Sequence, residues 1–202
     1  MAKSAGAKAT TRRQVTERVN ALSPEERTRR SEAACRHLLA VPEVREASAV
    51  LLYCPLPDEL DTWPALRALA ESRTRLILPR CRPAERELTC VEVADLDDDL
   101  FRGAFGILEP KSDVGVGLRE LDVVVTPGRA FDRRGNRVGR GAAYYDRLFS
   151  RPAFRAFKCG IAFDCQVLAE VPVEGHDIPM DAVVTESGLV RVCGAGAAEP
   201  RP

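Results

Sequence analysis

The sequence predicts a three-layer α/β/α fold with a mostly parallel central sheet. Short, wholly apolar runs are typical of strands that are covered on both faces. These runs alternate with segments of helical periodicity, as in successive β–α units. The chain has 202 residues, enough for one domain with its own core. We expect a single domain at 1–193 and a disordered tail at 194–202.

Helices are predicted at the start of the chain and after clear start signals. In "SPEE" the serine caps a helix, the proline takes its first position and the glutamate reaches back, so a helix should run over 23–40. "TWP" begins another over 62–71, and a last helix is expected over 142–149. The basic opening segment keeps helical periodicity, so we interpret it as a first helix and not as a transit peptide.

Strands are predicted for the apolar runs and for two less regular stretches. In chain order these are 47–54, 74–79, 86–93, 121–127, 158–163, 181–186 and 188–193. Ligands of open parallel sheets bind beyond the carboxyl ends of the strands. In a Rossmann-like sheet of this kind, we expect three loops to share one rim: "PLPDELDT" (55–62), "PGRAFDRRGNRVGRG" (127–141) and "DCQVLAEVPVEGHDIP" (164–179).

Composition argues against several classes of protein. Thirty basic and thirty acidic residues balance, so no net charge favours nucleic acid or a membrane surface. The longest apolar run, 49–54, is too short to span a bilayer. Seven cysteines without a C-x-x-C pair favour a reducing compartment, the cytoplasm. The two histidines, His37 and His176, lie in no nucleophile motif, which disfavours Ser-His and Cys-His enzymes.

The segment "GNRVGRGAAYYDR" (135–147) carries the strongest candidate chemistry. Gly139 and Gly141 let backbone N–H groups approach an anion, and the following helix offers its positive end to the same anion. Arg137 and Arg140 add forked donors that suit phosphate. The segment is neither a Walker A loop nor G-x-G-x-x-G. Phosphate binding and a glycine turn with a solvated arginine face therefore both remain open.

Two further features bear on this segment. A helix from Ala142 would place Ala142, Ala143 and Asp146 on one face, where small residues leave room for a magnesium-bound phosphate chain. Alanine is also simply a good helix former. A nucleic-acid patch is disfavoured, because the arginines lack interleaved exposed aromatic residues.

Five ordered stretches resemble one family. "PGRAFDRRGNRVGRGAAYYDRL" resembles the signature of the 5-formyltetrahydrofolate cyclo-ligases, also called methenyltetrahydrofolate synthetases. "ALSPEER", "LLYCPLPDELDT", "FGILEP" and "HDIPMDAVVTE" are similar to further family stretches in the same order. The resemblance implies a monomeric enzyme that uses ATP to convert 5-formyltetrahydrofolate to 5,10-methenyltetrahydrofolate, with release of ADP and phosphate.

The resemblance also implies roles for individual residues. Arg140 and Tyr144 would serve catalysis, and Asp146 and Asp177 would hold Mg²⁺. The ATP-binding set would be Lys8, Arg12, Arg137, Gly139, Arg140, Gly141, Ala142, Ala143, Tyr144 and Tyr145. The folate-binding set would be Cys54, Glu59, Phe105, Arg140 and Tyr144, with Glu59 on the pterin N–H groups and Phe105 stacked on the ring.

The segment departs from the family pattern G-x-G-x-G-Y-Y-D at Ala143, where the last glycine is expected. A methyl group there would crowd the phosphates, or strain the backbone if φ is positive. Some relatives carry lysine at the position of Ala142, and Arg129 is bulkier than the usual apolar residue. Two alternatives stay open: a catalytically weakened, regulatory folate- or nucleotide-binding paralogue, and another phosphate-handling enzyme such as a sugar-phosphate isomerase or an acyl-CoA transferase.

Overall fold

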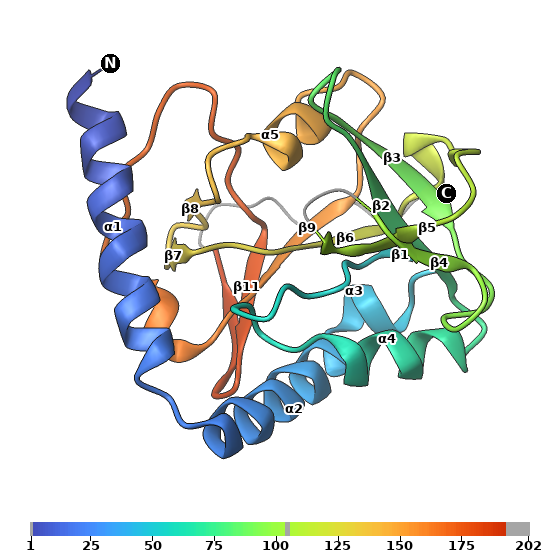
Figure 1. Ribbon diagram of the computed structural model, residues 1–202, viewed down its shortest axis with the longest axis horizontal. Helices are drawn as coiled ribbons and strands as arrows, with labels where there is room; N and C mark the ends of the chain where they lie inside the picture. Colours follow the sequence, from blue (N-terminus) through green and yellow to red (C-terminus); the bar gives the residue numbers. More distant parts are fainter. Residues whose placement is uncertain (1, 104–105, 193–202) are drawn as a thin grey trace.

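A seven-stranded sheet runs through the centre of the computed structural model, which describes residues 2–103 and 106–192 (Figure 1). The strand order is β12-β11-β9-β6-β1-β2-β3. The five inner strands are parallel, and β3 and β12 pair antiparallel at the edges. The predicted mostly parallel sheet is therefore confirmed. Its strands are β1 (Ala49–Leu51), β2 (Arg75–Arg82), β3 (Glu87–Glu92), β6 (Val123–Thr126), β9 (Phe157–Ile161), β11 (Ala182–Thr185) and β12 (Gly188–Arg191).

The inner strands are short and buried on both faces, as their apolar composition predicts. Every residue of β1, β6 and β11 is buried. β1 is shorter than the predicted strand over 47–54, and beyond its end the Tyr53 carbonyl accepts a hydrogen bond from Thr62 Oγ1 at 2.7 Å. β2 is longer than predicted, because it continues beyond the parallel region into a hairpin with β3.

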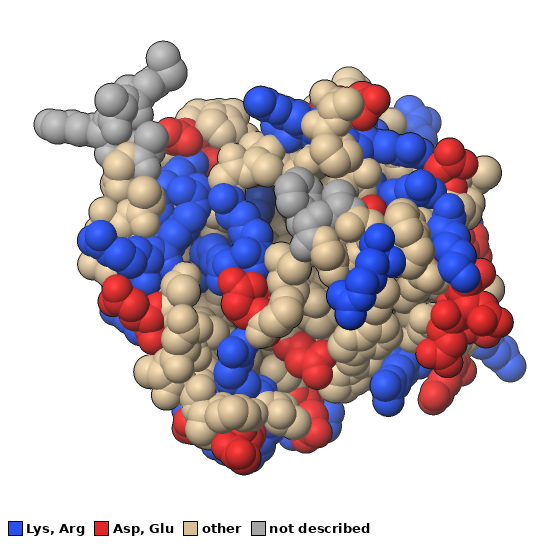
Figure 2. All heavy atoms as spheres, viewed as in Figure 1, with Lys and Arg blue, Asp and Glu red and all other residues tan. Residues whose placement is uncertain are grey.

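The helices are α1 (Ala2–Asn20), α2 (Pro24–Ala40), α3 (Pro42–Arg45), α4 (Trp63–Ala70) and α5 (Tyr144–Phe149). The predicted cap of α2 is confirmed: Ser23 Oγ accepts from the Glu26 N–H at 3.2 Å, and Glu26 Oε2 accepts from the Ser23 N–H at 3.1 Å. Lys and Arg side chains gather beside α1 on one face of the molecule (Figure 2). No helix of the described residues is long and apolar enough to cross a membrane.

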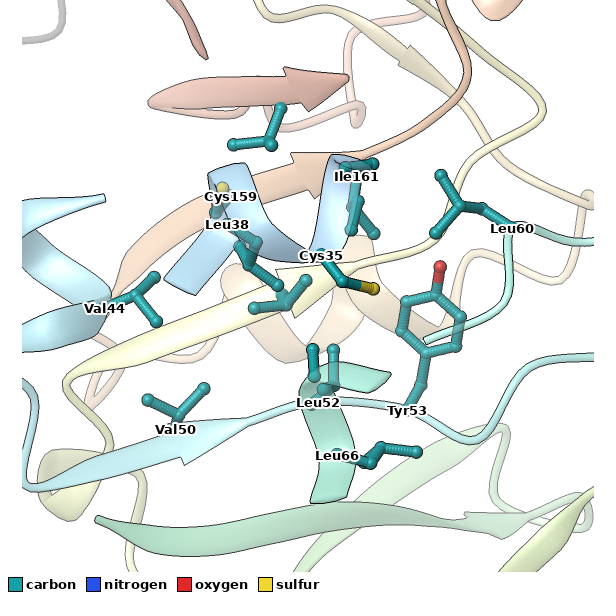
Figure 3. Packing of buried hydrophobic residues seen from close by; sticks show 14 of the residues in the cluster. Cys35, Leu38, Val44, Val50, Leu52, Tyr53, Leu60, Leu66, Cys159 and Ile161 are labelled. Atoms are coloured by element: carbon teal, nitrogen blue, oxygen red, sulfur yellow. The ribbon is translucent and has the colours of Figure 1, made fainter. Parts of the chain in front are cut away.

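The two faces of the sheet have separate cores. On one face, Val50 of β1 and Ile161 of β9 pack with Leu38 of α2 and Leu66 of α4 (Figure 3). On the other face, a second cluster contains strand residues such as Leu51 of β1 and Val124 of β6, together with Leu148 of α5. The layers are therefore α/β/α, although the layer that contains α5 includes only that short helix among the described residues.

Two small sheets lie outside the central one. They are β10 (Val167–Leu168), β7 (Ala130–Asp132) and β8 (Arg137–Val138), and the hairpin of β4 (Leu100–Arg102) with β5 (Leu108–Pro110). The prediction of a loop throughout 127–141 was wrong, because β7 and β8 form a hairpin there. The fully buried Asp132 carboxylate explains the hairpin, since it accepts hydrogen bonds from the Arg134, Asn136 and Val171 N–H groups.

The strand order reverses between β1 and β6. The chain leaves β1 for β2 on one side, whereas β6 leads to β9 and β11 on the other. At such a switch point, the loops after the two strands diverge and leave a crevice at the carboxyl ends. The fold thus places the segments after β1 and β6 at one opening.

Close packing in β9 gives the first test. A Cβ added to Gly160 would lie 2.5 Å from Cε1 of the fully buried Phe131 ring. We expect Gly160→Ala to lower the free energy of unfolding by about 1–3 kcal/mol in urea titrations. Gly175→Ala is the control, because no atom lies within 4 Å of its added Cβ, and its change should stay within about 0.5 kcal/mol. Equal stability of the two variants would contradict this packing.

Candidate functional site

A cavity of about 580 Å³ opens at the switch point. The three loops expected to share one rim all contribute to it, for example through Glu59, Gly128 and Asp177. Helix α1 adds Lys8 and Arg12, and β2, β3 and β5 supply a further, mostly apolar wall. The cavity therefore joins a charged side, near α1, to an apolar side.

The loop before α5 forms part of the charged side. Gly141 has φ +110° and Ala143 has φ +52° and ψ +29°, so the chain takes a left-handed path into the helix. Helix α5 begins at Tyr144, not at Ala142 as predicted, so Ala142 and Ala143 do not share a helix face with Asp146. The residue before the helix has the conformation that glycine adopts without strain.

Arg140 bridges this loop to the segment after β1. Its Nε donates to Glu59 Oε1 at 2.9 Å, and its Nη2 donates to Asp58 Oδ1. Arg129 donates to the other oxygen of Asp58. Burial alone would raise the pKa of Asp58, but the hydrogen bonds from the two arginines outweigh it and lower that pKa below its ordinary value. This carboxylate therefore stays ionised and keeps both guanidinium groups in place.

The role expected for Glu59 on the pterin stays a prediction. One oxygen accepts from Arg140, and the other accepts from the Leu56 N–H at 3.1 Å. Both carboxylate oxygens thus have partners within the protein. Glu59 lines the cavity, and its observed contacts position Arg140 and the loop after β1.

Arg137 lies deeper and is 6% exposed. Its Nη2 donates to Asp146 Oδ2 at 2.9 Å, and the guanidinium lies 5.8 Å from the centre of the Tyr145 ring. Asp146 Oδ1 accepts from the Ile178 N–H at 3.3 Å. The pair connects β8, α5 and the loop after β10, so Arg137 orients Asp146 at the cavity wall.

Lys8 of α1 is 6% exposed and donates to two acids of the loop after β10. The distances are 2.8 Å to Glu174 Oε2 and 2.6 Å to Asp177 Oδ2. Burial alone would lower the pKa of Lys8, but these hydrogen bonds outweigh it and raise that pKa. Arg12, one turn along, donates from Nε to the Gly139 carbonyl at 2.7 Å. Helix α1 thereby holds both the acidic loop and the glycine–arginine loop.

A candidate cation site lies beside Lys8. The ligand atoms of Glu174, His176 and Asp177 all lie within 4.8 Å of one another. The ammonium of Lys8 already makes ion pairs with Glu174 and Asp177. Glu174 and Asp177 therefore already bind one cationic group, close to the Ile178 N–H that donates to Asp146.

The cavity offers no activated thiol among its described residues. Burial raises the pKa of Cys54 and of Cys81 to about 12, so both thiols are protonated at neutral pH. Burial also raises the pKa of Tyr144 and, more strongly, that of Tyr145. These phenols are hydrogen-bond donors and not bases at neutral pH. Neither thiol therefore has the lowered pKa that is typical of a cysteine nucleophile.

The structure brings together almost all of the residues expected from the sequence. Those that line the one cavity are Lys8, Arg12, Cys54, Glu59, Arg137, Gly139, Arg140, Gly141, Ala142, Ala143, Tyr144, Tyr145, Asp146 and Asp177. Phe105 lies outside the described residues. Sequence reasoning missed Asp58, Glu109, Glu174 and His176, which also line the cavity. The first lies in the segment "PLPDELDT", which was expected at the rim, whereas the position of Glu109 depends on long-range packing.

Comparison with known proteins shows which family the chain is similar to. The sequence profile of the 5-formyltetrahydrofolate cyclo-ligase family matches residues 4–186. The 5-formyltetrahydrofolate cyclo-ligase of Escherichia coli K12 is 34% identical over 86% of this chain and 97% of its own. The structure of Aquifex aeolicus 5,10-methenyltetrahydrofolate synthetase superimposes with a TM-score of 0.82 at 35% identity, covering 96% of this chain and 97% of the other.

The chain belongs to the 5-formyltetrahydrofolate cyclo-ligase family. The resemblance seen in five short stretches is thus confirmed over nearly the whole length. A Mycoplasma pneumoniae 5,10-methenyltetrahydrofolate synthetase shares the fold at 19% identity, with a TM-score of 0.71. These relatives are enzymes by name, and none of the three is a sugar-phosphate isomerase or an acyl-CoA transferase.

The left-handed Ala143 distinguishes this cyclo-ligase-family chain from the expected glycine pattern. An L-residue in this conformation costs about 1–2 kcal/mol relative to the right-handed one, and glycine avoids that cost. We expect Ala143→Gly to raise the free energy of unfolding by about 1 kcal/mol in urea titrations. The matched control is Ala142→Gly, a neighbouring alanine with no positive φ, which should not gain stability. A loss of stability at 143 would show that the loop has another conformation in solution.

Proposed function

We propose that this cavity converts 5-formyltetrahydrofolate and ATP to 5,10-methenyltetrahydrofolate, ADP and phosphate. The observation that supports it best is that one cavity contains both a charged surface and an apolar surface. Lys8, Arg12 and the loop 139–143 suit a triphosphate, since glycine-rich backbone and basic side chains bind phosphate oxygens. The apolar side formed by β2, β3 and β5 suits a fused ring. Because the chain belongs to this family, we assign both surfaces to this one reaction.

In this proposal the formyl oxygen attacks the γ-phosphorus, and the bond between that phosphorus and the ADP oxygen breaks. The folate N10 then attacks the formyl carbon of the activated iminium phosphate, N10 loses its proton, and phosphate leaves. Positioning and charge neutralisation supply most of the catalysis in such transfers. Arg140 stabilises charge on the transferred group, and the protonated Tyr144 donates a hydrogen bond. Ala142, Ala143 and Tyr145 complete the wall around the nucleotide.

Magnesium is part of the proposal because of the charge of the cavity. Its lining carries four permanent cations, Lys8, Arg12, Arg137 and Arg140, against six carboxylates. A polyanionic nucleotide therefore needs further positive charge to enter. Asp146 and Asp177 would hold Mg²⁺, which prefers one or two carboxylates with phosphate oxygens and water. The bound ion would neutralise charge on the phosphates.

We also propose that the enzyme is a cytoplasmic monomer. One chain supplies the whole cavity wall described above, so we propose a monomer that acts on small molecules. Pairing of Arg129 and Arg140 with Asp58 and Glu59 does not favour a nucleic-acid backbone. The six described cysteines are free thiols, which suits the reducing cytoplasm.

A catalytically weakened paralogue remains the second candidate, and Ala143 is the observation that favours it. The backbone at Ala143 nevertheless keeps a conformation that a glycine would adopt. We therefore expect the unmodified chain to turn over, as measured by the near-ultraviolet absorbance of the methenyl product with and without ATP. If only Ala143→Gly formed product, the chain would be a weakened paralogue.

Arg140→Ala and Asp146→Asn test the proposed roles. We expect each variant to lower kcat/KM by about 100-fold or more, because each removes a charge aimed at the phosphates or at their metal. The control is Arg134→Ala in the exposed hairpin turn between β7 and β8, where the side chain is 78% exposed. That variant should keep the full rate. Equal rates for all three variants would remove the glycine–arginine loop from the mechanism.

A further inference from the structure

The apolar side of the cavity contains one carboxylate that the proposed mechanism does not use. Glu109, in β5, lines the cavity and is only 2% exposed. Its Oε1 is buried and has no hydrogen-bond partner within the described chain. A buried polar atom without a partner is costly and rare in native proteins. An acceptor left free at the wall of a cavity points to a ligand that donates.

The surroundings of Glu109 are built to hold it. Pro79 and Cys81 of β2 and Leu88 of β3 line the same part of the cavity wall. A Cβ added to Gly103 would lie 2.4 Å from Glu109 Oε2, so only glycine leaves room for this carboxylate. Burial raises the pKa of Cys81, and the charge of Glu109 and a side-chain hydrogen bond to Glu109 raise it further, while Glu109 Oε1 is left without a partner. The carboxylate is therefore fixed between β2 and the β4–β5 hairpin.

The chemistry of the two substrates decides which one Glu109 faces. An ionised carboxylate only accepts hydrogen bonds, and it pairs best with two neighbouring donors. Adenine presents a single amino group flanked by ring acceptors. The pterin ring presents the N3–H and the 2-amino group side by side, which matches a carboxylate. Each oxygen of Glu59, the other candidate, already accepts one hydrogen bond, from Arg140 or from the Leu56 N–H, whereas Glu109 Oε1 accepts none.

We propose that Glu109 determines substrate specificity by accepting hydrogen bonds from the N3–H and 2-amino edge of the pterin. The proposal rests on the proposed function, because it assigns the apolar side of the cavity to the folate. It places the pterin between β2, β3 and β5 and leaves the charged side near α1 to the triphosphate. The cavity would bind a ring without these donors more weakly, because such a ring would leave the buried Glu109 carboxylate unpaired.

Glu109→Gln tests the assignment with an almost isosteric side chain. We expect KM and Kd for 5-formyltetrahydrofolate to rise about 10- to 100-fold, as for loss of hydrogen bonds to a charged group. KM for ATP should not change. The melting temperature should stay the same or rise, since a buried unpartnered carboxylate becomes neutral. Glu85→Gln, at an exposed position of the β2–β3 turn, is the control and should leave all of these values unchanged.

A second measurement uses the unmodified protein, so it does not depend on the folding of a variant. A 5-formyltetrahydrofolate analogue without the 2-amino group should bind the wild-type chain about 10-fold more weakly or worse, and Glu109→Gln should lose most of this preference. Two results would overturn the inference and leave the proposed function standing. One is a Glu109→Gln variant that keeps the full wild-type preference for the substrate with the 2-amino group. The other is a variant in which KM rises for ATP and not for the folate. Failure of the proposed function would appear separately, as wild-type protein that forms no ATP-dependent product. Calorimetric titration of 5-formyltetrahydrofolate into both chains would then still decide the role of Glu109.

Discussion

The site depends on the pairing of its cations with oxygen acceptors from other parts of the chain. Lys8 pairs with Glu174 and Asp177, Arg137 with Asp146, and Arg140 with Asp58 and Glu59. Removing one partner of a buried pair, such as Arg137 with Asp146, typically costs about 3–5 kcal/mol, whereas the more exposed pair of Arg140 with Asp58 contributes less. The pairs therefore hold four separate segments around one cavity before any ligand arrives. They also leave carboxylates in excess, which makes the entry of a nucleotide dependent on added positive charge.

The fold supplies this arrangement through its topology. Reversal of the strand order between β1 and β6 opens the crevice, and the β7–β8 hairpin carries Arg137 into it. Helix α1 closes one side by holding both the Gly139 carbonyl and the acidic loop. The β2–β3 and β4–β5 hairpins close the other side with apolar residues and Glu109. The charged side of the cavity thus comes from α1 and the loops at the switch point, and the apolar side comes from β2, β3 and β5.

Local patterns in the sequence were enough for the sheet and the α2 cap, whereas the family resemblance named most of the residues that line the cavity. The "SPEE" signal and the apolar runs act over a few residues, so the structure confirmed the helix start and the buried strands that they predicted. The path of Ala143 was not predictable, because alanine prefers the right-handed conformation and only the surrounding loop imposes φ +52°. Glu109 was not predictable either, since its burial arises where β5 packs on β2. The hairpin at 130–138 depends on Asp132 reaching the Val171 N–H, a contact across 39 residues.

The most direct measurement is a crystal structure of the chain with Mg²⁺, a non-hydrolysable ATP analogue and 5-formyltetrahydrofolate. We expect the triphosphate to lie against the backbone of 139–143, within hydrogen-bond reach of Arg140 and the basic side chains of α1. The pterin should lie on the apolar side, between β2 and β5. A nucleotide bound elsewhere, with Arg140 still paired only to Asp58 and Glu59, would contradict the central claim that the glycine–arginine loop binds the triphosphate.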